Sequence, residues 1–148
     1  MSVERRIVGL DVGDVRIGVA VSDGLGITAQ PREVIRRSTP EKDVQAIRTL
    51  VEEAQAGQVV VGLPLTQRGE IGHQARKVLD FVERLRGELK AEVVTLDERF
   101  TTTVAERSPS YAEMSPTRRK ETVDKLAAQQ ILQTYLDRMR HRCEREKA

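Results

Sequence analysis

The stretch "IVGLDVGDVRIGVAVSD", from Ile7 to Asp23, decides the fold because it predicts two apolar strands joined by a short polar turn. One acid, Asp11, lies inside the first apolar run, where a charge is costly to bury. Alternate residues of a strand share a face, so Asp11 shares its face with Gly9 and Gly13. The open space beside the carboxylate suits a metal ion or a phosphate. The alternative is an aspartate that caps the turn by accepting backbone N–H bonds.

The pattern of apolar residues predicts the order of the other elements. We expect three strands first, over residues 6–12, 17–22 and about 28–36, and then a helix from Thr39-Pro40. A buried strand in "QVVVGLPL" follows, and then a helix whose apolar side, from Ala75 to Leu85, faces the core. The last two elements are a strand over residues 91–96 and a helix from about Thr117. Thr103 and Glu106 fit a capping box before a short helix, and "RSPSYAEMSP" predicts a surface loop. The whole predicts an α/β fold, in which three antiparallel strands continue into parallel strands of a mixed five-stranded sheet with helices on both faces.

Length and composition indicate one globular domain over residues 1–148, with a basic tail at about 138–148. The net charge of +2 is too small to prove a polyanionic partner. The single cysteine, Cys143, cannot form an internal disulfide, which fits a reducing compartment. We find no membrane-spanning run and no secretory segment, and therefore expect a cytoplasmic protein.

Two further acids point to the same chemistry as Asp11. Glu98 follows a strand and stands next to Asp97. Because successive side chains of a strand point to opposite faces of the sheet, only one of these two acids can lie on the same face as Asp11. Asp124 lies on the apolar stripe of the last helix, next to alanines that allow close approach to the sheet. A buried acid needs a partner, which is either an Arg or Lys or a divalent metal.

Three carboxylates from a strand, a strand end and a packed helix would suit a hard cation such as Mg²⁺ or Mn²⁺. Two such ions roughly 3.5–4 Å apart activate water and stabilise the leaving oxygen of a phosphodiester. Carboxylates placed in this way would therefore suit metal-assisted hydrolysis of a phosphodiester.

Four motifs, "GLDVGDVRIGVAVSD", "VVGLPL" with a following glycine, "DERFTT" and "VDKLAAQQILQTYL", resemble those of the YqgF/RuvX family of RNase H-like nucleases in order and approximate spacing. The resemblance runs from about Ile7 to Leu136. It implies an RNase H-like fold, cytoplasmic localisation in bacteria and metal-dependent cleavage of nucleic acid. It also implies maturation of the 5′ end of pre-16S ribosomal RNA, with Holliday-junction resolution as the alternative.

By this resemblance, Asp11 is the metal ligand of the first strand, Glu98 is the glutamate of "DER", and Asp124 is the helix aspartate before "KLAA". The choice of Glu98 over Asp97 rests on the resemblance alone.

The chain departs from the family pattern at two places. Asp14-Val15 stands where many relatives have a lysine before the arginine, which puts one positive contact beside the site in doubt. The loop "TQRGEIGHQA" lacks the Asn-Met-Asp-Gly sequence that is common in the family. It keeps Gly69 and Gly72, so its backbone can still contact a phosphate.

Phosphate contacts are expected from five residues: Arg16, Arg99, Thr101, Thr102 and Lys120. The alternative for each is a surface ion pair or a helix cap. His73 could assist proton transfer, although a lone loop histidine is usually only solvated. With two Phe, two Tyr and no Trp, extensive base stacking is not expected, so recognition should rest on phosphates and shape.

The leading prediction is a Mg²⁺- or Mn²⁺-dependent endonuclease that acts on structured RNA, as a monomer or homodimer, with branched DNA as the alternative substrate and no membrane partner. A nucleotide-binding module of the actin and sugar-kinase type also uses an acid and glycines in a hairpin like "DVGDVRIG". Its second lobe has no room in 148 residues. An inactive nucleic-acid-binding protein would bind without metal, and the presence of all three acids argues against it.

Overall fold

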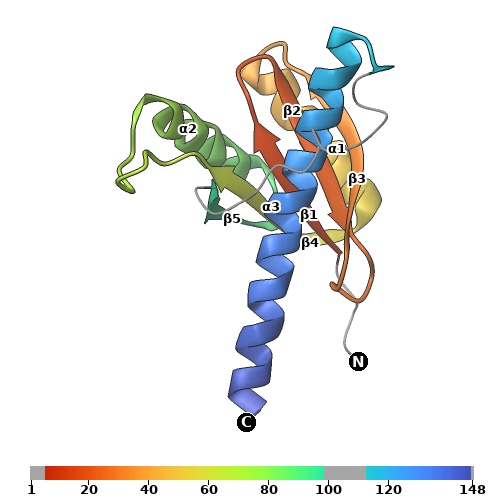
Figure 1. The fold of residues 1–148 in the computed structure, drawn as a ribbon, viewed down its shortest axis with the longest axis vertical. Helices are drawn as coiled ribbons and strands as arrows, with labels where there is room; N and C mark the ends of the chain where they lie inside the picture. Colours follow the sequence, from red (N-terminus) through yellow and green to blue (C-terminus); the bar gives the residue numbers. More distant parts are fainter. Residues whose placement is uncertain (1–5, 99–112, 148) are drawn as a thin grey trace.

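The computed structural model describes residues 6–98 and 113–147, where five strands form one sheet with helices on both faces (Figure 1). The strands are β1 (Arg6–Val12), β2 (Arg16–Ser22), β3 (Ala29–Arg36), β4 (Ala56–Leu63) and β5 (Glu92–Asp97), in the spatial order β3-β2-β1-β4-β5. The first three are antiparallel neighbours, whereas β4 runs parallel to both β1 and β5. The predicted mixed sheet is therefore confirmed.

The strand bounds differ from the predicted ones by a few residues for local reasons. The strand β4 begins two residues before "QVVVGLPL" and ends at Leu63. Its end precedes Pro64, which has no N–H to continue a ladder. The strand β5 extends one residue further than predicted, to Asp97, so that Glu98 directly follows its carboxyl end.

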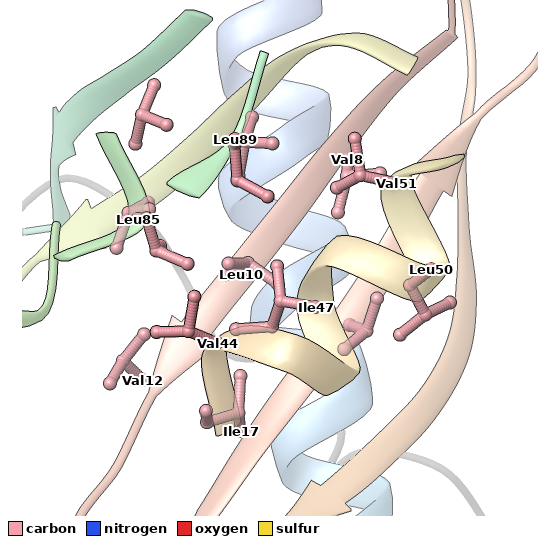
Figure 2. Packing of buried hydrophobic residues seen from close by; sticks show 14 of the residues in the cluster. Val8, Leu10, Val12, Ile17, Val44, Ile47, Leu50, Val51, Leu85 and Leu89 are labelled. Atoms are coloured by element: carbon pink, nitrogen blue, oxygen red, sulfur yellow. The ribbon is translucent and has the colours of Figure 1, made fainter. Parts of the chain in front are cut away.

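Two helices, α1 (Pro40–Ala54) and α2 (His73–Glu88), cover one face of the sheet. Thr39 caps α1, since its hydroxyl oxygen accepts the N–H of Lys42 at 3.2 Å. Figure 2 shows the apolar side chains of α1 lying against those of β1 and β2. This core contains Val8, Leu10, Val12, Ile17, Val44, Ile47, Leu50, Val51, Leu85 and Leu89. One face of β1 is therefore filled by apolar side chains.

The helix α3 (Pro116–Lys147) covers the other face of the sheet. Ser115 caps it, because the Ser115 hydroxyl oxygen accepts the N–H of Arg118 at 3.2 Å. Gly9 of β1 faces this helix, and a Cβ there would lie 2.7 Å from Cβ of Leu132. Glycine thus lets α3 pack close to the centre of the sheet.

The lower half of α3 extends past the sheet (Figure 1). Among the side chains of α3 that the structure describes, the last buried one is that of Leu136, and the helix continues to Lys147. The basic tail predicted at about 138–148 is therefore helical through residue 147, and Cys143 is exposed on it. In the described part of the chain, we find no helix with the length and apolarity needed to cross a membrane.

Two predictions lie wholly or partly outside the described residues. The capping box of Thr103 and Glu106 is outside them, as is the segment 107–112 of the predicted surface loop. The end of that loop is described and leads into the cap of α3 at Ser115.

Candidate active site

Asp11 lies on the face of the sheet that α3 covers, close to the carboxyl end of β1. Its strand neighbours Leu10 and Val12 point into the opposite core, so period two places the carboxylate away from it. In the antiparallel ladder, Asp11 is paired with Gly18 of β2. The residues beside the acid on its own face of the sheet are thus glycines, as the sequence predicted for Gly9 and Gly13.

Glu98 reaches Asp11 across another glycine. It follows β5, and its Oε1 occupies the space that a Cβ of Gly62 on β4 would take. The strand β4 lies between β5 and β1, so the absence of a side chain at Gly62 opens the path. The two carboxyl groups are hydrogen-bonded to each other. Parity could not distinguish Glu98 from Asp97, and the structure brings Glu98 to Asp11.

Burial of these two acids changes their protonation. The pKa of Glu98 is raised to about 8, first by burial and then by the charge of Asp11, the hydrogen bond to Asp11 and the charge of Asp97. Burial also raises the pKa of Asp11, while the hydrogen bond from Glu98 opposes this and the charge of Asp124 adds to it. At neutral pH a protonated Glu98 therefore donates to the Asp11 carboxylate, and the pair shares one proton.

Asp124 approaches the same place from α3. A Cβ on Gly18 would meet the backbone carbonyl of Asp124, so the helix touches β2 at this residue. The side chain of Asp124 accepts a hydrogen bond from Nε of Arg16, at 2.6 Å. Both side chains are largely buried, with 25% of Arg16 and 21% of Asp124 exposed. Of the two partners that the sequence left open for Asp124, the structure shows an arginine.

Within residues 6–98 and 113–147, no three acidic, histidine or cysteine side chains form a ready-made metal cluster. Asp124 is turned to Arg16, and the other two acids share a proton. The donor set still fits a hard divalent cation, because it consists of carboxylate oxygens only. Negative charge is already reduced at both positions: a shared proton removes one charge from Asp11 and Glu98, and the guanidinium of Arg16 neutralises Asp124. The proton and the guanidinium are the charges that a bound cation would replace.

An arginine that the sequence analysis did not single out supports the turn after β1. Nη1 of Arg37 donates to the carbonyl of Gly13 at 3.0 Å, and Nε of Arg37 donates to Asp43 at 3.1 Å. Asp43 is 2% exposed and also accepts the backbone N–H of Ser38. The guanidinium lies 5.0 Å from the ring centre of Phe81. The position of Asp43 beside the apolar residues of α1 was the only sequence signal for this network.

The remaining predicted contact residues are scattered or not described. Lys120 is exposed in α3, one turn before Asp124, and His73 is exposed as the first residue of α2. Oδ1 of Asp14 lies 3.5 Å from Nζ of Lys77 on α2. Arg99, Thr101 and Thr102 lie outside the described residues.

Comparison with known proteins gives a consistent result. The family model described as "RuvX: Holliday junction resolvase" matches residues 5–138. A protein of Natranaerobius thermophilus named "Putative pre-16S rRNA nuclease" is 45% identical over 133 residues, which is 90% of this chain and 94% of that protein. A protein of the same name from Desulforamulus reducens is 46% identical over 132 residues, or 89% and 96% of the two chains.

A solved structure has a similar fold. The RuvC of T. thermophilus, in complex with a Holliday junction substrate, superposes with a TM-score of 0.57 over 91% of this chain and 96% of that one, at 15% identity. At this identity the likeness concerns the fold, which is RNase H-like as predicted.

Proposed function

The chain belongs to the RuvX family, and from this membership and the site geometry we propose that it is a nuclease in which Asp11, Glu98 and Asp124 hold the divalent cations, Mg²⁺ or Mn²⁺. The observation that carries the proposal is the hydrogen-bonded pair of Asp11 and Glu98, for which Gly62 on β4 leaves room. Gly18 on β2 lets the backbone of Asp124 approach the same strand region, so three acids from three elements come together there.

Bound cations of this class activate a water molecule and stabilise the leaving oxygen of a phosphodiester. The chain supplies the oxygen ligands and the neutralising groups. Asp11, on the central strand, is held most firmly, because its backbone is paired on the β2 side and continues a strand paired to β4. To hold a cation, Glu98 would have to be deprotonated, because a carboxyl group binds a metal as its carboxylate.

Arg16 has two roles in this proposal. In the structure it neutralises Asp124. If Asp124 held a cation, the guanidinium of Arg16 would be available beside the site to bind a phosphate of the substrate. Lys120 contributes a second positive charge from the preceding turn of α3. Arg99, Thr101 and Thr102 remain proposed contacts, since they follow Glu98 directly in the sequence.

We propose structured precursor ribosomal RNA as the substrate and the 5′ end of 16S as the place of cleavage, in the cytoplasm. The name shared by relatives at 45–46% identity over about nine-tenths of the chain supports this. The description of the family model favours a second substrate, a four-way DNA junction.

The test is cleavage of labelled precursor RNA and of a four-way DNA junction, with Mg²⁺ or Mn²⁺ and with chelator. Wild type is compared with Asp11→Asn and Asp124→Asn, which keep shape and remove charge. We expect cleavage that chelator abolishes, and a loss of at least a hundredfold in rate in both variants with binding retained. Equal cleavage by wild type and the variants would refute the assignment. The substrate cut faster decides between RNA processing and junction resolution.

A further inference from the structure

The exposed end of α3 carries a row of basic side chains that the active site does not use. Arg138, Arg142 and Arg145 recur at intervals of four and three residues, so they lie on one side of the helix. With His141 they line a shallow hollow of about 470 Å³. All four side chains are exposed. Arg140 points elsewhere and forms an ion pair with Asp137 at 2.9 Å.

The excess of basic over acidic residues in the chain also lies at this end of the helix. The family match ends at residue 138. Residues 139–148 contain four Lys and Arg and two acids, and the 138 residues before them contain 21 of each kind. The net charge of +2 therefore belongs to the segment beyond the family match. Charges placed to stabilise the helix dipole would act only in the last turn, whereas Arg138 lies nine residues before the helix end.

The row is aligned with the candidate active site. Arg142 follows Asp124 by eighteen residues, which is five full turns at 100° per residue, so both project from the same side of α3. At 1.5 Å per residue, the axial distance from Asp124 is about 27 Å to Arg142 and about 32 Å to Arg145. Asp124 lies where the sheet covers the helix, and the row lies past Leu136, where it does not.

We propose that Arg138, Arg142 and Arg145 form a second contact for the phosphate backbone of the nucleic acid bound at the active site. The inference rests on the proposed function and adds where the substrate runs. At about 3.4 Å per base pair, 27–32 Å corresponds to about eight or nine base pairs of B-form DNA, and to somewhat more in A-form RNA, which rises less per base pair. Only a substrate whose duplex extends at least this far from the cleaved bond reaches the row. Because the three arginines contact phosphates and not bases, this contact adds no preference for a base sequence.

The test uses RNA hairpins with stems of about 6 and about 20 base pairs and measures binding in chelator, so that no cleavage occurs. The variant combines Arg138→Gln, Arg142→Gln and Arg145→Gln. The control combines Lys42→Gln, Arg48→Gln and Lys90→Gln, which removes the same charge from α1 and the region after α2, away from α3. Circular dichroism checks that the helix content of the variant is unchanged.

For the long stem, we expect the variant to bind about tenfold more weakly and the slope of log K against log salt to fall by about 2 to 3. The short stem should bind alike in all three proteins. Long-stem affinity equal to wild type overturns the inference, as does an equal loss in the control or on the short stem. A changed oligomeric mass with unchanged affinity would assign the row to self-association and overturn it too.

Cleavage of the short stem separates this inference from the proposed function. If wild type and variant cleave it equally and the long stem is insensitive to the variant, the nuclease stands and the second contact fails. If neither protein cleaves with metal while long-stem binding depends on the row, the nuclease fails and the contact stands.

Discussion

Nε of Arg16 lies 2.6 Å from Oδ2 of Asp124, so one acid of the candidate active site is neutralised by a cation that belongs to the chain itself. In the neighbouring pair of Asp11 and Glu98, one of the two negative charges is removed in another way, by a shared proton. Together, the proton and the guanidinium reduce the repulsion among three acids that come close beneath α3. A metal held by all three acids would have to displace both.

Removing the guanidinium should have opposite effects on stability and on metal binding. We expect Arg16→Gln to lower the free energy of unfolding by about 1–3 kcal/mol in chelator, because Asp124 loses a charged hydrogen bond. The same variant should bind Mn²⁺ more tightly, since Arg16 no longer competes for Asp124. Thermal unfolding and calorimetry measure the two effects. Arg140→Gln, which breaks an exposed ion pair, is the control and should change neither. Weaker Mn²⁺ binding by Arg16→Gln would contradict this account.

The stability of the metal-free protein should fall as the pH rises from about 4.5 to 8. The pKa of Glu98 is about 8 in the folded chain and 4.5 ordinarily, so the folded state holds more protons than the unfolded state in this range. Stability falls with pH wherever the folded state holds the extra proton. Chemical denaturation in chelator at several pH values measures the slope. Glu98→Gln should flatten it, and an unchanged slope in that variant would show that Glu98 is not the group.

The contact between Gly18 and Asp124 can be tested by adding one methyl group at position 18. A Cβ at Gly18 would meet the backbone carbonyl of Asp124 on α3. We expect Gly18→Ala to destabilise the fold by about 1–3 kcal/mol and to slow cleavage, because α3 must move away from Asp11. Gly87→Ala is the control: nothing lies within 4 Å of its Cβ, and it should be neutral or stabilising by up to about 1 kcal/mol. Equal stability of the two variants would be inconsistent with close packing at Gly18.

The buried ion pair under the β1–β2 turn should matter more for stability than the surface ones. Asp43→Ala leaves Arg37 without its carboxylate and the N–H of Ser38 without its acceptor. We expect a loss of about 2–4 kcal/mol in urea unfolding. Glu52→Ala removes the exposed partner of Arg48 and should cost less than about 0.5 kcal/mol. If Asp43→Ala lowered the free energy of unfolding as little as Glu52→Ala does, Arg37 would not support the turn after β1 through Asp43.

The sequence was informative wherever local periodicity decides the outcome. Alternation placed Asp11 on the face opposite Leu10, and the helical stripe placed Asp124 against the sheet. Contacts between distant residues were not predictable in this way. The path of Glu98 over Gly62 depends on β4 lying between β5 and β1, and Arg16 meets Asp124 across 108 positions. Local patterns do not contain such pairings. Nor did they show that the basic tail continues α3.

The central claim is that Asp11, Glu98 and Asp124 hold the divalent cations, and the most direct test is calorimetric titration of the protein with Mn²⁺ near pH 7, repeated in buffers of different ionisation enthalpy. Because Glu98 shares a proton with Asp11, binding should release about one proton. Glu98→Gln should abolish the release, Asp11→Asn the binding itself, and Asp124→Asn should weaken binding. Mn²⁺ binding that is equally strong in Asp11→Asn, or no binding by wild type at millimolar Mn²⁺, would contradict the account.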